Sequence, residues 1–462
     1  MARKSFLTNM RLHRSIFRLH FYAGLLVAPF LLILSITGAI YLFNTEIEDM
    51  VFGDWRFAAA EGPHLAPEAM VGGALAAYPG STATRIDLPV TPERTAVVFL
   101  TPAEGDPFRV YVDPVSGQAL GSFVYSHTLV GFADKMHGSL MVGDGGSFIV
   151  ELASCWAIVL IMTGLYLWWP RGSSNVWGVL LPRGLKGRLL WREIHGVVGM
   201  WSSLLILFLL LTGLPWAENW SSYLHRFLDM TGSGYPASYR THASHEVVSP
   251  GATKTLLETT PGIAWTLESA PAPLSGHAHH QMAGAAPIDV AAAASIFAGE
   301  GLTTAYRLIY PKDKHVVFTA YTYPDQPQGQ RTIHVDQYTG EVINDIGYAD
   351  YGVGAKAIEL GVQLHMGNYF GIPNQIVMLI AALGGVALAF TGPVMWMKRR
   401  KAGLGAPPPH GSGKPVWGVT IVLLAFGLLF PALGFSLVAV FTLERLVLAR
   451  IAPVRKWLGI RS

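Results

Sequence analysis

Four long apolar runs constrain this chain more than any other feature of its sequence. They cover residues 21–43, 148–169, 197–216 and 376–397, and three of them contain no Asp, Glu, Lys or Arg. About 20 helical residues cross the roughly 30 Å hydrocarbon core of a bilayer. Only 14% of all residues are charged, against about a quarter in soluble domains. The sequence therefore predicts a polytopic α-helical membrane protein.

The two ends of the chain add to this topology. The first run is longer than a signal-peptide core and no small-residue cleavage site follows it closely, so we expect a retained first span. Residues 416–448 form a further apolar region with Pro431 and Gly434 near its middle. This region is too long for one ordinary span, and we expect a hairpin of two short spans or one bent span.

Basic residues set the expected orientation. They cluster before the first run, between the second and third, after the fourth and in the C-terminal tail. Lys and Arg concentrate on the cytoplasmic side of membrane proteins, so the N-terminus and these segments are expected inside. Residues 44–147 and 217–375 then face outward. Their alternating apolar and polar stretches, with turns at Asp113–Gly117 and Asp336–Gly340, predict two small α+β modules.

The chain repeats itself. A Gly four residues after a His and a Thr-Gly pair 17 and 18 residues after it follow both His20 and His195. A second pattern, with Gly at +6, Thr-Gly at +26 and +27 and Trp at +31, follows both His137 and His365. We interpret this as a tandem duplication with parallel halves, whose pseudo-axis runs along the membrane normal. Such an axis pairs His20 with His195 near the inner face and His137 with His365 near the outer face.

Two histidines on facing helices can fill both axial positions of a haem iron, although imidazole also suits zinc and copper. His13 is a rival ligand for the inner pair, and His127 for the outer pair. Because His137 and His365 precede their runs by ten or more residues, we expect each on a short helix that folds back after a break near Gly143 or Gly371. We interpret the Thr-Gly pairs as packing features. Arg18, Arg192 and Lys135 are candidates to meet haem propionates.

Other features are less specific. The run containing His277, His279 and His280 could bind a metal or be a solvated loop. Glu151, inside the second run, could carry protons or lie at the water interface. The single cysteine, Cys155, excludes an internal disulfide and Cys-ligated clusters. No nucleotide-binding fingerprint is evident, so a donor of electrons to such haems is expected to be a separate molecule. No nucleic-acid partner is expected.

The chain resembles the PepSY-associated transmembrane family over residues 10 to 450. The resemblance rests on the four histidine motifs, on the span ends TGLYLWWPR and TGPVMWMKRR, and on the outward segments YVDPVSGQ and HVDQYTGE. It implies a bacterial inner-membrane ferrisiderophore reductase with two haems b, ligated by His20, His195, His137 and His365. It also implies electrons from a cytoplasmic or membrane donor and a periplasmic ferric chelate as substrate. The alternatives are a haem-free, membrane-anchored PepSY binding or regulatory protein and a His-based metal transporter.

The expected organisation follows from these patterns. A four-helix core from the duplication carries two periplasmic PepSY-like modules and a C-terminal hairpin. The segments are 1–43 (N-terminus and span 1), 44–125 (module 1), 126–169 (His-bearing segment and span 2), 170–194 (cytoplasmic loop), 195–216 (span 3), 217–350 (module 2), 351–397 (His-bearing segment and span 4), 398–415 (cytoplasmic loop), 416–448 (hairpin) and 449–462 (tail).

Overall fold

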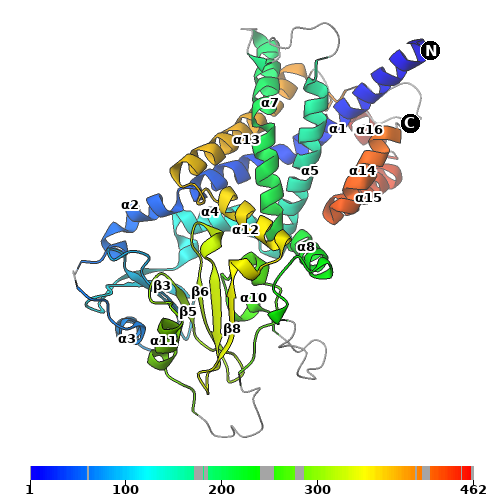
Figure 1. Ribbon diagram of the computed structural model, residues 1–462. Helices are drawn as coiled ribbons and strands as arrows, with labels where there is room; N and C mark the ends of the chain where they lie inside the picture. Colours follow the sequence, from blue (N-terminus) through cyan, green and yellow to red (C-terminus); the bar gives the residue numbers. More distant parts are fainter. Residues whose placement is uncertain are drawn as a thin grey trace. The chain divides into compact units, whose positions relative to one another are not determined.

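The computed structural model describes most of the chain (Figure 1), namely residues 2–59, 62–170, 180–181, 186–239, 254–275, 286–400, 403–407, 417–448 and 450–458. The chain divides into two compact units. The membrane unit consists of Met1–Leu42, Ala133–Leu224 and His365–Ser462, and the sheet unit of Phe43–Phe132 and His225–Leu364.

Four long helices form the core of the membrane unit. They are α1 (Ala2–Tyr41), α5 (Asp144–Trp168), α7 (Gly187–Gly213) and α13 (Ile372–Arg399). Each packs against two others, because α1 contacts α5 and α13, and α7 contacts the same two helices. All four are long and apolar enough to cross a bilayer. The four predicted spans are therefore confirmed as a closed four-helix bundle in a multi-pass membrane protein.

The C-terminal apolar region is a helical hairpin. Helix α14 (Trp417–Leu429) ends just before Pro431, where α15 (Pro431–Leu443) begins and continues as a π-helical turn to Leu448. The break lies at Pro431, as predicted from the sequence, because proline cannot supply a backbone N–H to a continuing helix. Residues 431–448 are long enough to be a fifth candidate span. Helix α14 has 13 residues and, at about 1.5 Å per residue, is too short for a full crossing.

Two short helices carry the outer histidines. Helix α4 (Leu129–Ser139) ends with His137 in its last turn, and α12 (Val353–His365) ends with His365. The long helices α5 and α13 begin only after Gly143 and Gly371. Both glycines have nearly the same left-handed backbone, with φ of 64° and 61°, which residues with a Cβ rarely adopt. The predicted breaks are confirmed, and they have the same conformation in both halves.

The sheet unit contains one antiparallel sheet of eight strands. Its order is β4-β3-β2-β1-β5-β6-β7-β8, so the two predicted modules contribute four strands each and join where β1 pairs with β5. The predicted turns open with Asx motifs, in which the carboxylates of Asp113 and Asp336 each accept two backbone N–H groups of their own turn. The strands are β1 (Thr82–Asp87), β2 (Ala96–Thr101), β3 (Phe108–Val112), β4 (Ala119–Phe123), β5 (Arg307–Ile309), β6 (Phe318–Thr322), β7 (Arg331–Val335) and β8 (Val342–Gly347).

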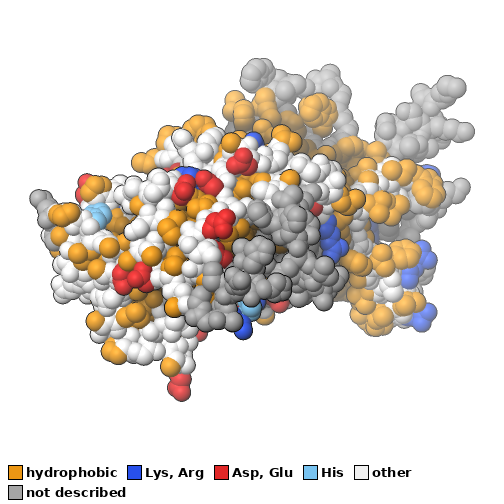
Figure 2. All heavy atoms as spheres, turned by 60° about the horizontal axis from the view of Figure 1, so that its bottom comes forward, with side chains coloured by type: hydrophobic (Ala, Val, Ile, Leu, Met, Phe, Trp, Pro, Cys, Tyr) orange, Lys and Arg blue, Asp and Glu red, His pale blue; other side chains and the backbone are white. Residues whose placement is uncertain are grey.

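Helices α3 (Pro67–Ala77) and α11 (Val290–Gly299) supply the main core of the sheet unit. They pack on one face of the sheet, and alternate strand residues such as Ile86, Val98 and Ile333 point into this core. The side of the sheet unit seen in Figure 2 carries acidic and hydrophobic side chains scattered among neutral atoms, as is typical of a water-exposed surface. The other α-helices among the described residues are α2 (Asn44–Arg56), α8 (Glu218–Thr231), α10 (Leu256–Thr259) and α16 (Ala452–Leu458).

A buried histidine on the other face of the sheet predicts pH-dependent stability. His334 is fully buried between the hydroxyls of Tyr239 and Thr319, each 2.9 Å from a ring nitrogen. Burial lowers the pKa of His334 to about 3. The unfolded chain takes up this proton near pH 6.5, so stability is complete above that pH and falls as the pH drops toward 3. We expect a loss of about 2 kcal/mol from this group at pH 5.

This loss is measurable by following the thermal unfolding of the β-sheet signal at pH 7.5 and pH 5. The decrease in melting temperature should be smaller in His334→Gln than in the unsubstituted protein. His225, whose pKa burial lowers to about 4, remains as a second titrating group in both proteins. An equal decrease in both proteins would contradict the assignment to His334.

Candidate functional site

Each of the four motif histidines is hydrogen-bonded to a threonine on a neighbouring helix of the membrane unit. The distances from the imidazole Nδ1 to the threonine Oγ1 lie between 2.8 and 3.1 Å. In the first half, α1 carries His20 and also Thr37, which binds His137. In the second half, α7 carries His195 and also Thr212, which binds His365. The pairs are His20 with Thr163, His137 with Thr37, His195 with Thr391 and His365 with Thr212.

The threonines set the tautomer of the histidines. Each threonine hydroxyl lies 2.7 or 2.8 Å from the carbonyl oxygen four residues earlier in its own helix, to which it donates. Its oxygen is then left to accept the Nδ1–H of the imidazole. The hydrogen therefore sits on Nδ1, and the lone pair of Nε2 is available to bind a metal. An imidazole oriented through its second nitrogen in this way is typical of metal-ligating histidines.

At three of the four pairs, the glycine after the threonine makes room for the ring, whereas a Cβ added at Gly392 would lie 3.8 Å from Cε1 of His195, an ordinary contact. A Cβ added at Gly38 would lie 3.1 Å from Cε1 of His137, and one at Gly164 would lie 3.2 Å from Cε1 of His20. Gly213 stands in the same relation to His365, at 3.2 Å. We call each Thr-Gly pair with its imidazole a histidine seat. The packing role expected for these pairs holds for the glycines, whereas the hydrogen bonds of the threonines were missed.

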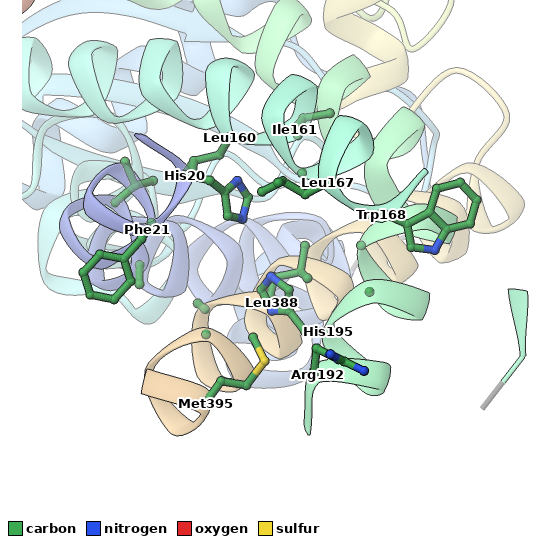
Figure 3. Close-up of a pocket in the computed structure, with 18 of the residues that line it drawn as sticks. His20, Phe21, Leu160, Ile161, Leu167, Trp168, Arg192, His195, Leu388 and Met395 are labelled. Carbon is green, nitrogen blue, oxygen red and sulfur yellow. The ribbon is translucent and has the colours of Figure 1, made fainter. Parts of the chain in front are cut away.

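The structure brings His20 and His195 together. Their ring centroids are 6.4 Å apart and their planes are nearly perpendicular, at 83°. Figure 3 shows the two imidazoles turned toward a common space between the helices. A metal bonded to both Nε2 atoms at about 2 Å would place the two centroids about 6 Å apart. The observed spacing fits two axial ligands of one iron.

A cavity of about 650 Å³ surrounds these two rings. Its walls come from α1, α5, α7 and α13 and are mainly apolar, with Phe21, Leu160 and Leu388 among the side chains in Figure 3. Pockets for cofactors are typically about 300–1,000 Å³, apolar and equipped with a few polar anchors. The cavity therefore suits a large, flat and largely apolar group held by two histidines.

Basic side chains also line the cavity. Arg188, Arg192 and Arg399 belong to its wall. Guanidinium groups bind carboxylates well, so they are suited to the two acidic side chains of a haem. Of the residues predicted to meet haem propionates, Arg192 lines the cavity. Arg18 donates a hydrogen bond to the carbonyl of Pro407. Arg188 and Arg399 were missed, although both stand among the basic residues that flank the apolar runs.

His137 and His365 form the second pair of seats. Their imidazoles are held by Thr37 of α1 and Thr212 of α7. The indole of Trp216 packs edge-on against His365, with ring centroids 6.1 Å apart. The Nε2 lone pairs are again left free by the threonine contacts. The described residues contain no cluster of three or more His, Cys, Asp or Glu side chains arranged for a metal ion.

The rival histidines occupy different places. His13 lines the cavity two helical turns before His20, and its ring lies 6.5 Å from that of Tyr166. His127 belongs to a 3-10 turn of the sheet unit and is exposed. Neither is held in a histidine seat. His277, His279 and His280 lie outside the described residues.

Glu151 is not at a water interface. It is 1% exposed, and its carboxylate accepts hydrogen bonds from the backbone N–H and the side-chain amide of Asn219, at 3.0 and 3.2 Å. Asn219 is the second residue of α8, where a negative charge is favourable. Glu151 therefore anchors the start of α8 to α5.

One comparison with known proteins found a family match. A family model described as the PepSY-associated TM region covers residues 17–399, which include all four seats. No curated protein matches the chain.

Proposed function

Since the chain belongs to the PepSY-associated transmembrane family, we propose that it carries electrons across the bacterial inner membrane through two bis-histidine haems b. The proposed substrate is a periplasmic ferric chelate of the siderophore type. The observation that carries the proposal is the set of four histidine seats, arranged as two pairs with free Nε2 atoms. A haem-free anchor for PepSY modules has no use for four oriented imidazoles.

The residues of the chain account for binding and orientation. His20 and His195 would hold one haem, and His137 and His365 the other. When bound, haem supplies reversible one-electron chemistry at its iron. Thr391 and its three counterparts would fix the orientation of each imidazole, so that its Nε2 points toward the haem site. The apolar walls of the cavity would exclude water from that site.

The net reaction takes one electron from a donor on the cytoplasmic side and gives it to Fe(III) in the chelate. The Fe(II) product is held less tightly by hard oxygen ligands, so iron is released. The proposed direction rests on the basic residues at the span ends and in the tail, which favour a cytoplasmic N-terminus and periplasmic sheet unit.

A reoxidation experiment tests this function. The purified protein is reduced anaerobically with a stoichiometric amount of dithionite and then mixed with a ferric siderophore. We expect the reduced haem bands to disappear as a ferrous-specific chelator captures Fe(II). The corresponding gallium siderophore, which cannot accept an electron, is the control and should leave the bands unchanged. Bands that stay reduced with the ferric chelate would contradict reductase activity.

Thr391→Val should weaken the inner haem site. Valine has nearly the same shape as threonine but cannot accept the Nδ1–H of His195, which Thr391 holds at 2.8 Å. Loss of such a partner typically costs about 10- to 100-fold in metal affinity. The measurement is haem retention during dilution, together with the midpoint potential of the remaining haem. Thr391→Ser keeps the hydroxyl and should restore both values. Equal behaviour of the two variants would show that the hydroxyl does not orient His195.

A further inference from the structure

The second face of the sheet carries a row of arginines and aromatic rings. Side chains alternate along the strands, so residues adjacent to the α3/α11 core positions point to this face. At its centre, where β1 pairs with β5, the two halves of the sheet contribute charged residues to one surface. We call this set the arginine–aromatic row, which consists of Arg85, Phe99, Arg109, Tyr125, Arg307, Tyr321 and Tyr323.

The guanidinium groups of the row lie against aromatic rings. Arg85 is 4.3 Å from the centroid of Phe99, and Arg109 is 3.9 Å from that of Tyr125. Arg307 lies 5.4 to 5.6 Å from the rings of Tyr321 and Tyr323. All are within the roughly 6 Å range of cation–π interaction. The rings hold the cations in place without neutralising them.

The row has an excess of positive charge. Asp87 pairs with Arg85 and lies 3.8 Å from Arg307. Within the described part of the chain, no carboxylate forms an ion pair with Arg109. Three arginines against one aspartate leave a net charge of +2. The neighbouring acids, Glu48 and Asp49, are already paired with Arg56 and Arg94.

The row also remains partly accessible. The side chain of Arg307 is 31% exposed and that of Arg85 is 14% exposed. To one side, toward β7 and β8, the same face is closed, because Tyr239 covers the fully buried His334. To the other side, Trp55 of α2 lies directly on Gly121 of β4. At the centre, the carbonyl oxygens of Pro261 and Gly262 accept hydrogen bonds from Arg85, Tyr321 and Arg307, and Tyr321 is buried. The partly exposed members of the row are therefore Arg109 with Tyr125 and Arg307 with Tyr323.

We propose that the arginine–aromatic row binds the ferric chelate and selects chelates that are both anionic and aromatic, as ferric tris-catecholates are. A tris-catecholate complex is a trianion whose oxygens can pair with guanidinium groups and whose rings can stack on them. A ferric trihydroxamate is neutral and lacks the rings. This inference rests on the proposed function, because it takes a ferric chelate as the substrate.

Binding to the haem-loaded, full-length protein in detergent tests the proposal. The probe is a gallium tris-catecholate, which is redox-inert, and its affinity is measured by quenching of protein fluorescence. Arg109→Gln and Arg307→Gln should each raise Kd about 3- to 10-fold, and the double variant more than 10-fold. Lys312→Gln removes an exposed positive charge outside the row and is the control, with an unchanged Kd. Binding should also weaken with added salt.

The outcomes separate this inference from the proposed function. A double variant that binds the tris-catecholate as well as the unsubstituted protein overturns the inference, as does equally tight binding of a neutral gallium trihydroxamate. The haem spectrum and melting temperature of the variants must stay unchanged, and a loss of either with the loss of binding would mean that the row only stabilises the sheet. A protein that contains no haem but binds the tris-catecholate through these arginines would refute the electron transfer and leave the binding site standing.

Discussion

His195→Ala is expected to lower the haem content from about two to about one per chain. The imidazole of His195 faces that of His20 across the cavity, with centroids 6.4 Å apart. Alanine at this position removes one axial ligand and its hydrogen bond to Thr391, while the rest of the cavity wall remains. Haem would then be held by His20 alone in an apolar pocket and should be lost during purification. The remaining haem should keep the spectrum of the other centre.

His13→Ala is the matched control for this prediction. His13 lines the same cavity and lies on the same helix as His20, but it has no histidine seat. Its removal should leave two haems and an unchanged spectrum. If His13→Ala loses a haem and His195→Ala does not, the ligand assignment at this end of the bundle is wrong.

His365→Ala should abolish the reduction of external ferric chelates. The substitution empties the seat formed by Thr212 and Gly213 and leaves His137 without its partner. We expect half of the haem to be lost and chelate reduction to fall to the background rate. The haem between His20 and His195 should still be reduced by dithionite, because the threonines that hold these two histidines, Thr163 and Thr391, lie on α5 and α13 rather than on α7 with Thr212.

The control for His365→Ala is His127→Ala. His127 precedes His137 by ten residues and was the rival outer ligand, but it is exposed and lies in the sheet unit. Its replacement should leave haem content and chelate reduction intact. Loss of the second haem in His127→Ala, with retention in His137→Ala, would transfer the ligand role to His127.

Much of the membrane unit could be predicted from the sequence. Apolar length located the four long helices, and the matching offsets of His, Gly and Thr revealed the repeat. The breaks at Gly143 and Gly371 followed from helix length, because a straight helix would have placed His137 and His365 outside the hydrocarbon. These features depend on local sequence and on simple distances along a helix.

The contacts between elements could not be predicted. A Thr-Gly pair in an apolar helix is typical of close packing, and its hydrogen bond to an imidazole on another helix is visible only in three dimensions. The union of the two modules into one sheet depends on β1 and β5, which are more than 200 residues apart and short. The arginine–aromatic row extends over both halves because of that union, since Asp87 and Arg307 meet across it.

Haem quantitation and the optical spectrum of the purified protein test the central claim most directly. The protein should be expressed in haem-replete cells, and its haem measured against its polypeptide concentration. We predict about two haems b per chain and a split α-band on reduction with dithionite, as expected for two bis-histidine centres in different surroundings. A colourless, folded protein without haem would contradict the account.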